Sequence, residues 1–144
     1  MRGYAAIGLH NPKDPANVGG VLRAAGCYGA SLVVVEGSRY LRKHPRTDTQ
    51  KAYRHLPVVA GDLHSLVPFD CVPVAVDLID GAIPLHSYHH PERAFYIFGA
   101  EDATLGVKIT DWCRDVVYVP TNYCMNLAAT VNVVLYDRQA KNLR

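Results

Sequence analysis

A single arginine lies among small apolar residues near the start of a helix-like segment. Arg23 follows the adjacent glycines Gly19 and Gly20 in the stretch ANVGGVLRAAG. Glycine weakens a helix start, and an arginine on an apolar helical face usually needs an anionic partner. The pattern favours an anion site, although close helix packing would by itself explain the glycines. A nucleotide-binding loop is disfavoured, because neither G-x-G-x-x-G nor G-x-x-x-x-G-K-[ST] is present.

A carboxylate and a histidine cluster are further candidates for chemistry. Glu101 directly follows an apolar run in FGAED, where a carboxylate can serve as a general acid or base or can cap a helix. His86, His89 and His90 lie between two prolines, and this favours solvated loop histidines over a metal site. The four cysteines contain no C-x-x-C pair, so neither a zinc site nor a disulfide framework is supported.

Alternating strands and helices must position these groups. Apolar runs predict strands over residues 4–10, 31–37, 56–61, 71–78, 94–100 and 115–120. Helical spacing predicts helices over 17–28 and 126–144, and the pieces 62–69 and 105–113 are of helix length or shorter. This alternation predicts an α/β domain with a mostly parallel sheet and helices on both faces. Ligands in such sheets bind where the carboxyl ends of strands meet loops.

The bulk composition is that of an ordinary globular domain. The 144 residues suffice for one domain with its own core, and a net charge of +2 permits an anionic partner without requiring one. We find no cationic leader and no apolar run of membrane-spanning length, so a soluble, cytoplasmic setting is expected.

The final predicted helix has more apolar surface than one core needs. Leu127, Val131, Val134 and Leu135 form a core stripe, and Val133 and Tyr136 widen it. Burial within one subunit and a dimer contact are both compatible with this pattern.

Three strand ends together resemble the ordered motifs of the SpoU/TrmH-type RNA ribose methyltransferases. Residues 17–23 are similar to the first motif, N-x-G-x-x-x-R, and residues 98–102 to a strand ending in Gly-x-Glu. Val119 and Pro120, followed by CMNLA at 124–128 and a long helix, are similar to the third motif. The motifs occur in the family's order and spacing and cover essentially the whole chain.

The resemblance implies a SPOUT-type α/β knot, in which the C-terminal segment forms a deep trefoil knot. It also implies a homodimer that transfers a methyl group from S-adenosylmethionine to a ribose 2′-hydroxyl of tRNA or rRNA, without a metal. Residues 1–144 would be a single methyltransferase domain with no appended RNA-binding domain. The implied cofactor residues are Val76, Asp77, Leu78, Phe98, Gly99, Glu101, Val119, Pro120, Asn126 and Leu127.

The same resemblance implies four catalytic residues. Arg23 would grip the phosphate beside the target ribose, because a guanidinium keeps its proton and is a poor base. Asn17 and Glu101 would orient Arg23 and each other, and Asn126 would hold a loop or a cofactor group. In the family, the arginine of one subunit meets the cofactor site of the other.

Two departures from the family pattern leave an alternative open. Cys124 and Ala128 stand where the third motif has serines, so a non-catalytic RNA-binding protein of the same fold is the rival interpretation. Clustering of cations in residues 38–55 suggests an RNA contact, and a solvated loop face is the alternative. The cations of this stretch are Arg39, Arg42, Lys43, Arg46, Lys51 and Arg54.

Overall fold

The computed structural model describes residues 3–39, 55–101 and 103–142. Within them one sheet has the order β3-β2-β1-β6-β4-β7-β5, and every strand pair is parallel. This confirms the predicted α/β class. The strands are β1 (Tyr4–His10), β2 (Leu32–Glu36), β3 (Val58–Ala60), β4 (Val72–Val76), β5 (Ile83–Pro84), β6 (Arg93–Phe98) and β7 (Asp115–Tyr118).

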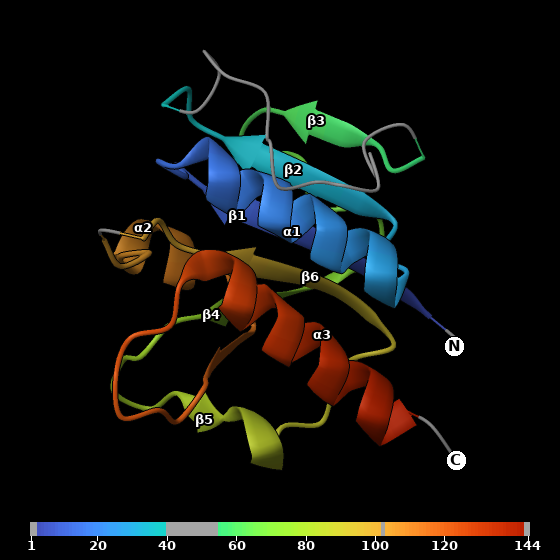
Figure 1. Cartoon of the computed structure of the whole chain (residues 1–144). Coiled ribbons are helices and arrows are strands. Elements are labelled where there is room, and N and C mark those ends of the chain that lie inside the picture. Colours follow the sequence, from blue (N-terminus) through green and yellow to red (C-terminus); the bar gives the residue numbers. More distant parts are fainter. Residues whose placement is uncertain (1–2, 40–54, 102, 143–144) are drawn as a thin grey trace.

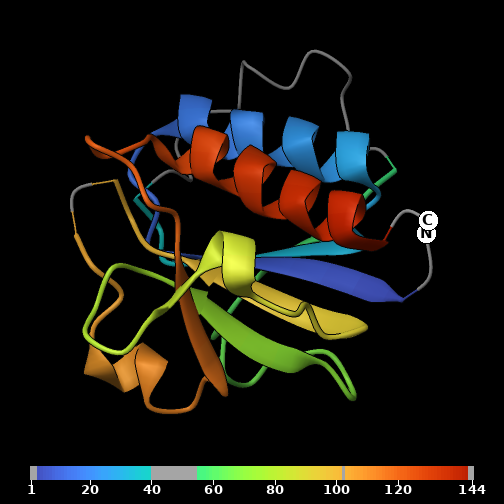
Figure 2. The ribbon, with the colours of Figure 1, turned by 90° about the horizontal axis from the view of Figure 1, so that it is seen from below.

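Helices cover both faces of the sheet, but unequally. The long helices α1 (Pro15–Tyr28) and α3 (Leu127–Asn142) lie side by side on one face and run in the same direction (Figure 1). The single-turn helix α2 (Val107–Thr110), orange in Figure 2, lies on the other face. A short 3-10 helix, η2 (Leu85–Ser87), precedes β6. Residues 62–69 form turns rather than a helix, because Asp62 accepts hydrogen bonds from Ser65 and Pro68 interrupts the segment.

Local chemistry explains where α1 begins and ends. The Asp14 carboxylate accepts a hydrogen bond from the Ala16 amide at 2.9 Å, and Pro15 occupies the first helical position. Gly29 ends the helix in the left-handed conformation with φ of 70°.

Two hydrophobic clusters lie on opposite faces of the sheet. Alternate strand residues such as Ile7 and Leu9 pack against α1 and α3, whereas Ala6, Phe95 and Ile97 face α2. Both faces of the central strands are therefore buried, as their near-continuous apolar sequences predict. Gly8 belongs to the α2 side, where a Cβ atom would come within 2.8 Å of the Phe95 ring.

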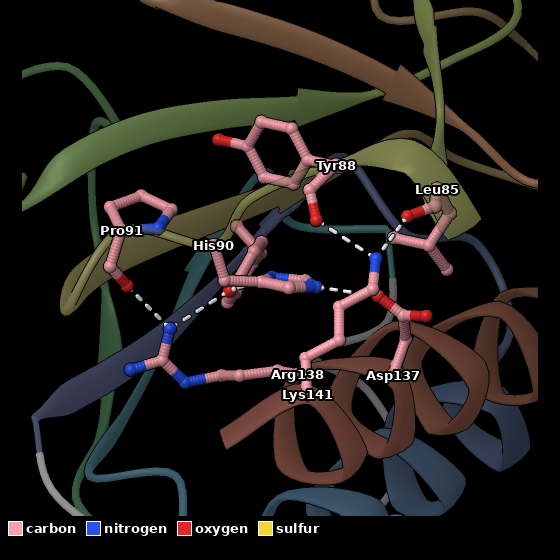
Figure 3. A network of polar contacts seen from close by, with 8 residues as sticks. Leu85, Tyr88, His90, Pro91, Asp137, Arg138 and Lys141 are labelled. Carbon is pink, nitrogen blue, oxygen red and sulfur yellow. Dashed lines mark hydrogen bonds and ion pairs between the residues drawn. The ribbon is translucent and has the colours of Figure 1, made fainter.

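A buried polar network ties α3 to the start of β6 (Figure 3). The His90 side chain is only 1% exposed, with Nδ1 2.6 Å from the Tyr96 hydroxyl and Nε2 2.7 Å from the Asp137 carboxylate. The expectation of solvated loop histidines is therefore wrong for His90, because Asp137, 47 residues away, supplies a buried partner. Burial lowers the pKa of His90, although Asp137 acts in the opposite direction.

Arg138 is the most deeply buried charge among the described residues, at 1% exposure. Its guanidinium donates to the carbonyls of Pro91 and Glu92, both at 2.7 Å, and to the Tyr96 hydroxyl at 3.0 Å. Lys141 donates to the carbonyls of residues 85 and 88 and pairs with Asp137 at 2.8 Å. The contacts of Arg138 replace part of the water that its guanidinium loses on burial, while its buried Nε atom has no hydrogen-bond partner in the described part of the chain. Together with those of Lys141, they hold the C-terminal half of α3 in place.

The strand order interleaves distant parts of the chain. β6 lies between β1 and β4, and β7 pairs with β4 on its other side, so the segments that follow β6 and β7 leave the sheet at the same edge. The threading of a trefoil knot through these segments stays a prediction.

Candidate functional site

A cleft of about 830 Å³ lies at the carboxyl ends of β4, β6 and β7. Three chain segments far apart in sequence form its walls, because parallel strands deliver their ends to one edge of the sheet. The lining residues are Val76, Asp77, Leu78, Phe98, Gly99, Ala100, Glu101, Ala103, Thr104, Tyr118, Val119, Thr121, Asn122, Tyr123, Cys124, Met125, Leu127 and Thr130.

Most of the residues expected to hold a cofactor line this cleft. They are Val76, Asp77, Leu78, Phe98, Gly99, Glu101, Val119 and Leu127. Pro120 and Asn126 do not line it. The Asn126 side-chain oxygen instead accepts the Ala129 amide at 2.7 Å and so caps the first turn of α3.

Asp77 and Gly99 shape the loop that follows β6. The two carboxylate oxygens of Asp77 accept the Leu78 amide at 2.9 Å and the Leu105 amide at 3.1 Å. A Cβ atom at Gly99 would lie 3.2 Å from the Ala103 carbonyl oxygen, which is tighter than most such contacts. A glycine at this position therefore lets Ala103 and Leu105 approach the end of β6 closely.

Glu101 joins the first and second motif segments. Its carboxylate accepts the Asn17 side-chain amide at 3.2 Å and the Lys13 backbone amide at 3.1 Å. These bonds link the cleft to the segment that leads into α1. Because both oxygens accept hydrogen bonds, Glu101 acts in this arrangement as an acceptor that fixes the rim of the cleft.

Arg23 does not reach the cleft in a single chain. It lies on the exposed side of α1, six residues beyond Asn17, which places it about 240° around the helix and about 9 Å along it. The structure therefore brings Asn17 and Glu101 together within one chain and leaves Arg23 on the exposed side of α1.

Several lining residues escaped sequence reasoning. Residues 121–123 lie between the third-motif proline and the CMNLA segment, and their position in a loop after a strand end was the available signal. Tyr123 is 87% exposed. The basic stretch 38–55 lies mostly outside the described residues, and its described member Arg39 donates to the Asn11 carbonyl at 2.7 Å.

Some kinds of site are not found in the described part of the chain. No group of three or more histidine, cysteine, aspartate or glutamate side chains there could hold a metal ion. None of the described helices combines the length and apolarity that crossing a membrane requires. All four cysteines are free thiols, and burial raises the pKa of Cys113 to about 11, so this thiol is a poor nucleophile.

Several solved protein structures have the same fold as this chain. An rRNA methyltransferase from Sinorhizobium meliloti superposes with a TM-score of 0.86 at 19% identity, over 100% of this chain and 58% of that one. The SpoU methyltransferase AviRb from Streptomyces viridochromogenes, in complex with the cofactor AdoMet, superposes with a TM-score of 0.85 at 22% identity, over 100% and 60%. A structure described as giving insight into 2-OH methylation of C/U34 on tRNA has a TM-score of 0.81 at 19% identity, over 98% and 92%.

The chain thus spans about three fifths of the length of the first two of these proteins. A search of curated proteins found no match. The model of the SpoU rRNA methylase family matches residues 4–136, nearly the whole sequence. The chain belongs to the SpoU rRNA methylase family.

Proposed function

We propose that this protein is an S-adenosylmethionine-dependent methyltransferase that acts on a ribose 2′-hydroxyl of tRNA or rRNA in the cytoplasm. The observation that carries the proposal is that segments from all three family motifs meet at one cleft. Glu101 of the second motif is hydrogen-bonded to Asn17 of the first, and Val119 and Leu127 of the third line the same space. The AdoMet complex of the similar protein AviRb supports the choice of cofactor.

The residues of the cleft fit this cofactor. Its volume of about 830 Å³ lies within the range of small-molecule sites. Phe98, Leu127 and Met125 offer apolar surface, and the absent side chain at Gly99 leaves backbone close to a ligand. The carboxylates of Asp77 and Glu101 suit a ligand that carries positive charge.

When bound, the cofactor supplies an electrophilic methyl group. The chain's own residues must bring a 2′-hydroxyl into line with that group and exclude competing water. Arg23 would hold the neighbouring phosphate through paired hydrogen bonds, a role for which a planar guanidinium is suited. Glu101 and Asn17 would fix the rim against which the nucleotide is placed.

We further propose that two copies of the chain complete the site. Arg23 lies on the exposed side of α1, and the neighbouring face of α3 exposes Val133 by 37% and Tyr136 by 57%. Tyr136 also contacts Tyr28 of α1 edge-on, so the two helices present one continuous surface. A second copy covering this surface would bring its own Arg23 towards a cleft that the first copy's arginine does not reach.

Three measurements test the proposal. Calorimetry should detect S-adenosylmethionine binding, and no heat at millimolar cofactor would instead support the non-catalytic RNA-binding alternative. Sedimentation should give about twice 15.8 kDa, so a monomer at micromolar concentration would refute the shared site. Mapping of ribose methylation in total RNA, with and without the protein, should reveal the modified nucleotide.

A substitution separates cofactor binding from transfer. Arg23→Ala should abolish methyl transfer and leave cofactor affinity nearly unchanged, because the arginine would contact RNA rather than the cofactor. Arg23→Lys is the matched variant, which keeps the charge but loses paired hydrogen bonding. Unchanged turnover in Arg23→Ala would remove this residue from the mechanism.

A further inference from the structure

A second pocket lies at the same sheet edge as the cleft. It has a volume of about 490 Å³ and is bounded by His10 at the end of β1, Glu36 at the end of β2, and Asp62 after β3. The cleft occupies the ends of β6, β4 and β7. The segment after β6 separates the two, because residues 99–101, 103 and 104 line the cleft and residues 105–109 line the pocket. A ligand that spans this segment would reach both.

One wall of the pocket is aromatic. The rings of His64 and Trp112 are stacked, with centroids 4.6 Å apart and planes 12° from parallel. Trp112 is half-buried against the cluster on the α2 side of the sheet, so its position is held by packing. Leu105 and Val107 add apolar surface beside these rings. Such a wall suits a flat heterocycle, which gains affinity by stacking on aromatic side chains.

Other residues that line the pocket are polar, and hydrogen bonds hold their side chains in place. Glu36 is 2.6 Å from His10 Nδ1 through one oxygen and accepts the Leu63 amide at 2.8 Å through the other. Glu36 thus orients the imidazole, whose Nε2 atom has no hydrogen-bond partner among the described residues.

Charge narrows the class of ligand. Asp62 adds a second carboxylate to Glu36, and two hydrogen bonds from Ser65 hold the pKa of Asp62 below its usual range. Lys108 is the cation among the lining residues. Two carboxylates beside one lysine disfavour a phosphate in this pocket and favour the amino edge of a base, since carboxylates accept from exocyclic amino groups.

We propose that this pocket binds an amino-bearing nucleobase of the RNA, beside the nucleotide whose ribose enters the cleft. The base would stack on the His64–Trp112 wall and present its amino group to Asp62 and the Glu36-oriented His10. This inference rests on the proposed RNA substrate. It adds a specificity site that selects the sequence around the methylated position.

The chain offers a direct reporter, because Trp112 is its only tryptophan. The full-length protein would be titrated at neutral pH with hexacytidylate and with hexauridylate, which differ at the amino group of the base. Tryptophan fluorescence should change saturably with hexacytidylate, and the dissociation constant should be at least about fivefold lower than for hexauridylate. Equal affinities, or no change in fluorescence, would overturn the proposal.

Substitutions identify the groups responsible, with binding followed by anisotropy of labelled oligonucleotides. Trp112→Ala should weaken hexacytidylate binding roughly tenfold, as expected for a lost stack, whereas Trp112→Phe should retain most of it. His64→Ala should also weaken binding, and it keeps the proposal testable if Trp112→Ala fails to fold. Full affinity in both alanine variants would overturn the stacking role.

Asp62→Asn tests recognition of the amino group. It should reduce the preference for cytidine over uridine, whereas Asp70→Asn, a matched change at the amino end of β4, should not. A preference that survives Asp62→Asn would overturn this assignment. Binding of cytidine monophosphate without binding of the hexamer would also overturn it, since the pocket would then serve free nucleotides.

These outcomes are independent of methyl transfer. Cofactor binding and RNA methylation without a change in Trp112 fluorescence would refute base binding in the pocket but leave the proposed enzyme activity supported. Hexacytidylate binding at Trp112 without cofactor binding would refute the proposed methyltransferase activity but support base binding in the pocket.

Discussion

Replacing Asp77 should loosen the loop over the cleft by a predictable amount. Its carboxylate accepts the Leu105 amide at 3.1 Å across 28 residues of chain and the Leu78 amide at 2.9 Å one residue away. The first bond holds Leu105 against the end of β4, whereas the second constrains only a local turn. Asp77→Ala removes both acceptors, and Asp77→Asn retains one neutral acceptor oxygen.

The size of the effect follows from these contacts. A hydrogen bond to a charged group contributes about 1.5–3 kcal/mol, and a neutral one about 1 kcal/mol. Because the bond to Leu105 is half-buried, we take about 2 kcal/mol for its loss in Asp77→Ala and about 1 kcal/mol in Asp77→Asn. A ligand that needs the ordered loop must supply this free energy, so its dissociation constant should rise about thirtyfold and about fivefold, respectively.

Two assays check this reasoning. Calorimetry with S-adenosylmethionine should rank the affinities as wild type, then Asp77→Asn, then Asp77→Ala, and the exposed neighbour Asp80→Ala should match wild type. Hydrogen exchange should show faster exchange of the Leu105 amide in Asp77→Ala, with or without cofactor. Unchanged protection of that amide would refute the role of Asp77 in holding the loop. Equal losses of affinity in both variants would instead indicate direct recognition of its charge.

Two further predictions concern the buried network in Figure 3. Burial lowers the pKa of His90, so the unfolded chain binds a proton that the folded chain does not, and stability should fall as pH drops below about 6.5. Urea unfolding at pH 7.5 and 5.5 should show a smaller loss of stability in His90→Gln than in wild type; equal losses would exclude His90 as the source. Arg138→Met should lower the free energy of unfolding by about 2–4 kcal/mol, because the Pro91 carbonyl loses its charged donor. A urea-unfolding change below about 1 kcal/mol would mean that the desolvation cost of the buried cation cancels its hydrogen bonds.

The hydrogen bonds of the network agree with a neutral His90. Nε2–H donates to Asp137, so Nδ1 is left to accept the Tyr96 hydroxyl proton, and the Tyr96 oxygen in turn accepts from Arg138. Protonation of His90 Nδ1 would place its N–H opposite the O–H of Tyr96, so that two donors face each other unless the hydroxyl rotates. This geometry gives a structural reason for the expected loss of stability in acid.

Local sequence determined the fold class and most of the strands. Apolar runs such as residues 32–36 and 93–98 need cover on both faces, and only a parallel sheet between layers supplies it. Local sequence also determines the ends of α1, because Pro15 occupies its first position and Gly29 ends it. Strand ends were predicted less well, since Val58–Ala60 and Val72–Val76 are shorter than the apolar runs that contain them.

The resemblance to the family also identified most of the cleft. Eight of the ten cofactor residues that it implies line this space, and they lie together because the carboxyl ends of parallel strands meet at one end of the sheet. Asn126 could not be placed in this way, since an asparagine before a helix can cap it or face a ligand. The structure places it as the cap.

Tertiary contacts alone decided the remaining features. The partner of His90 is 47 residues away, the bond from Glu101 to Asn17 spans 84 residues, and the pocket at Trp112 draws on four separate segments. Sequence spacing carries information over a few residues along a helix or strand. It contains none about which distant side chains the packing of a sheet and its helices brings within hydrogen-bonding distance.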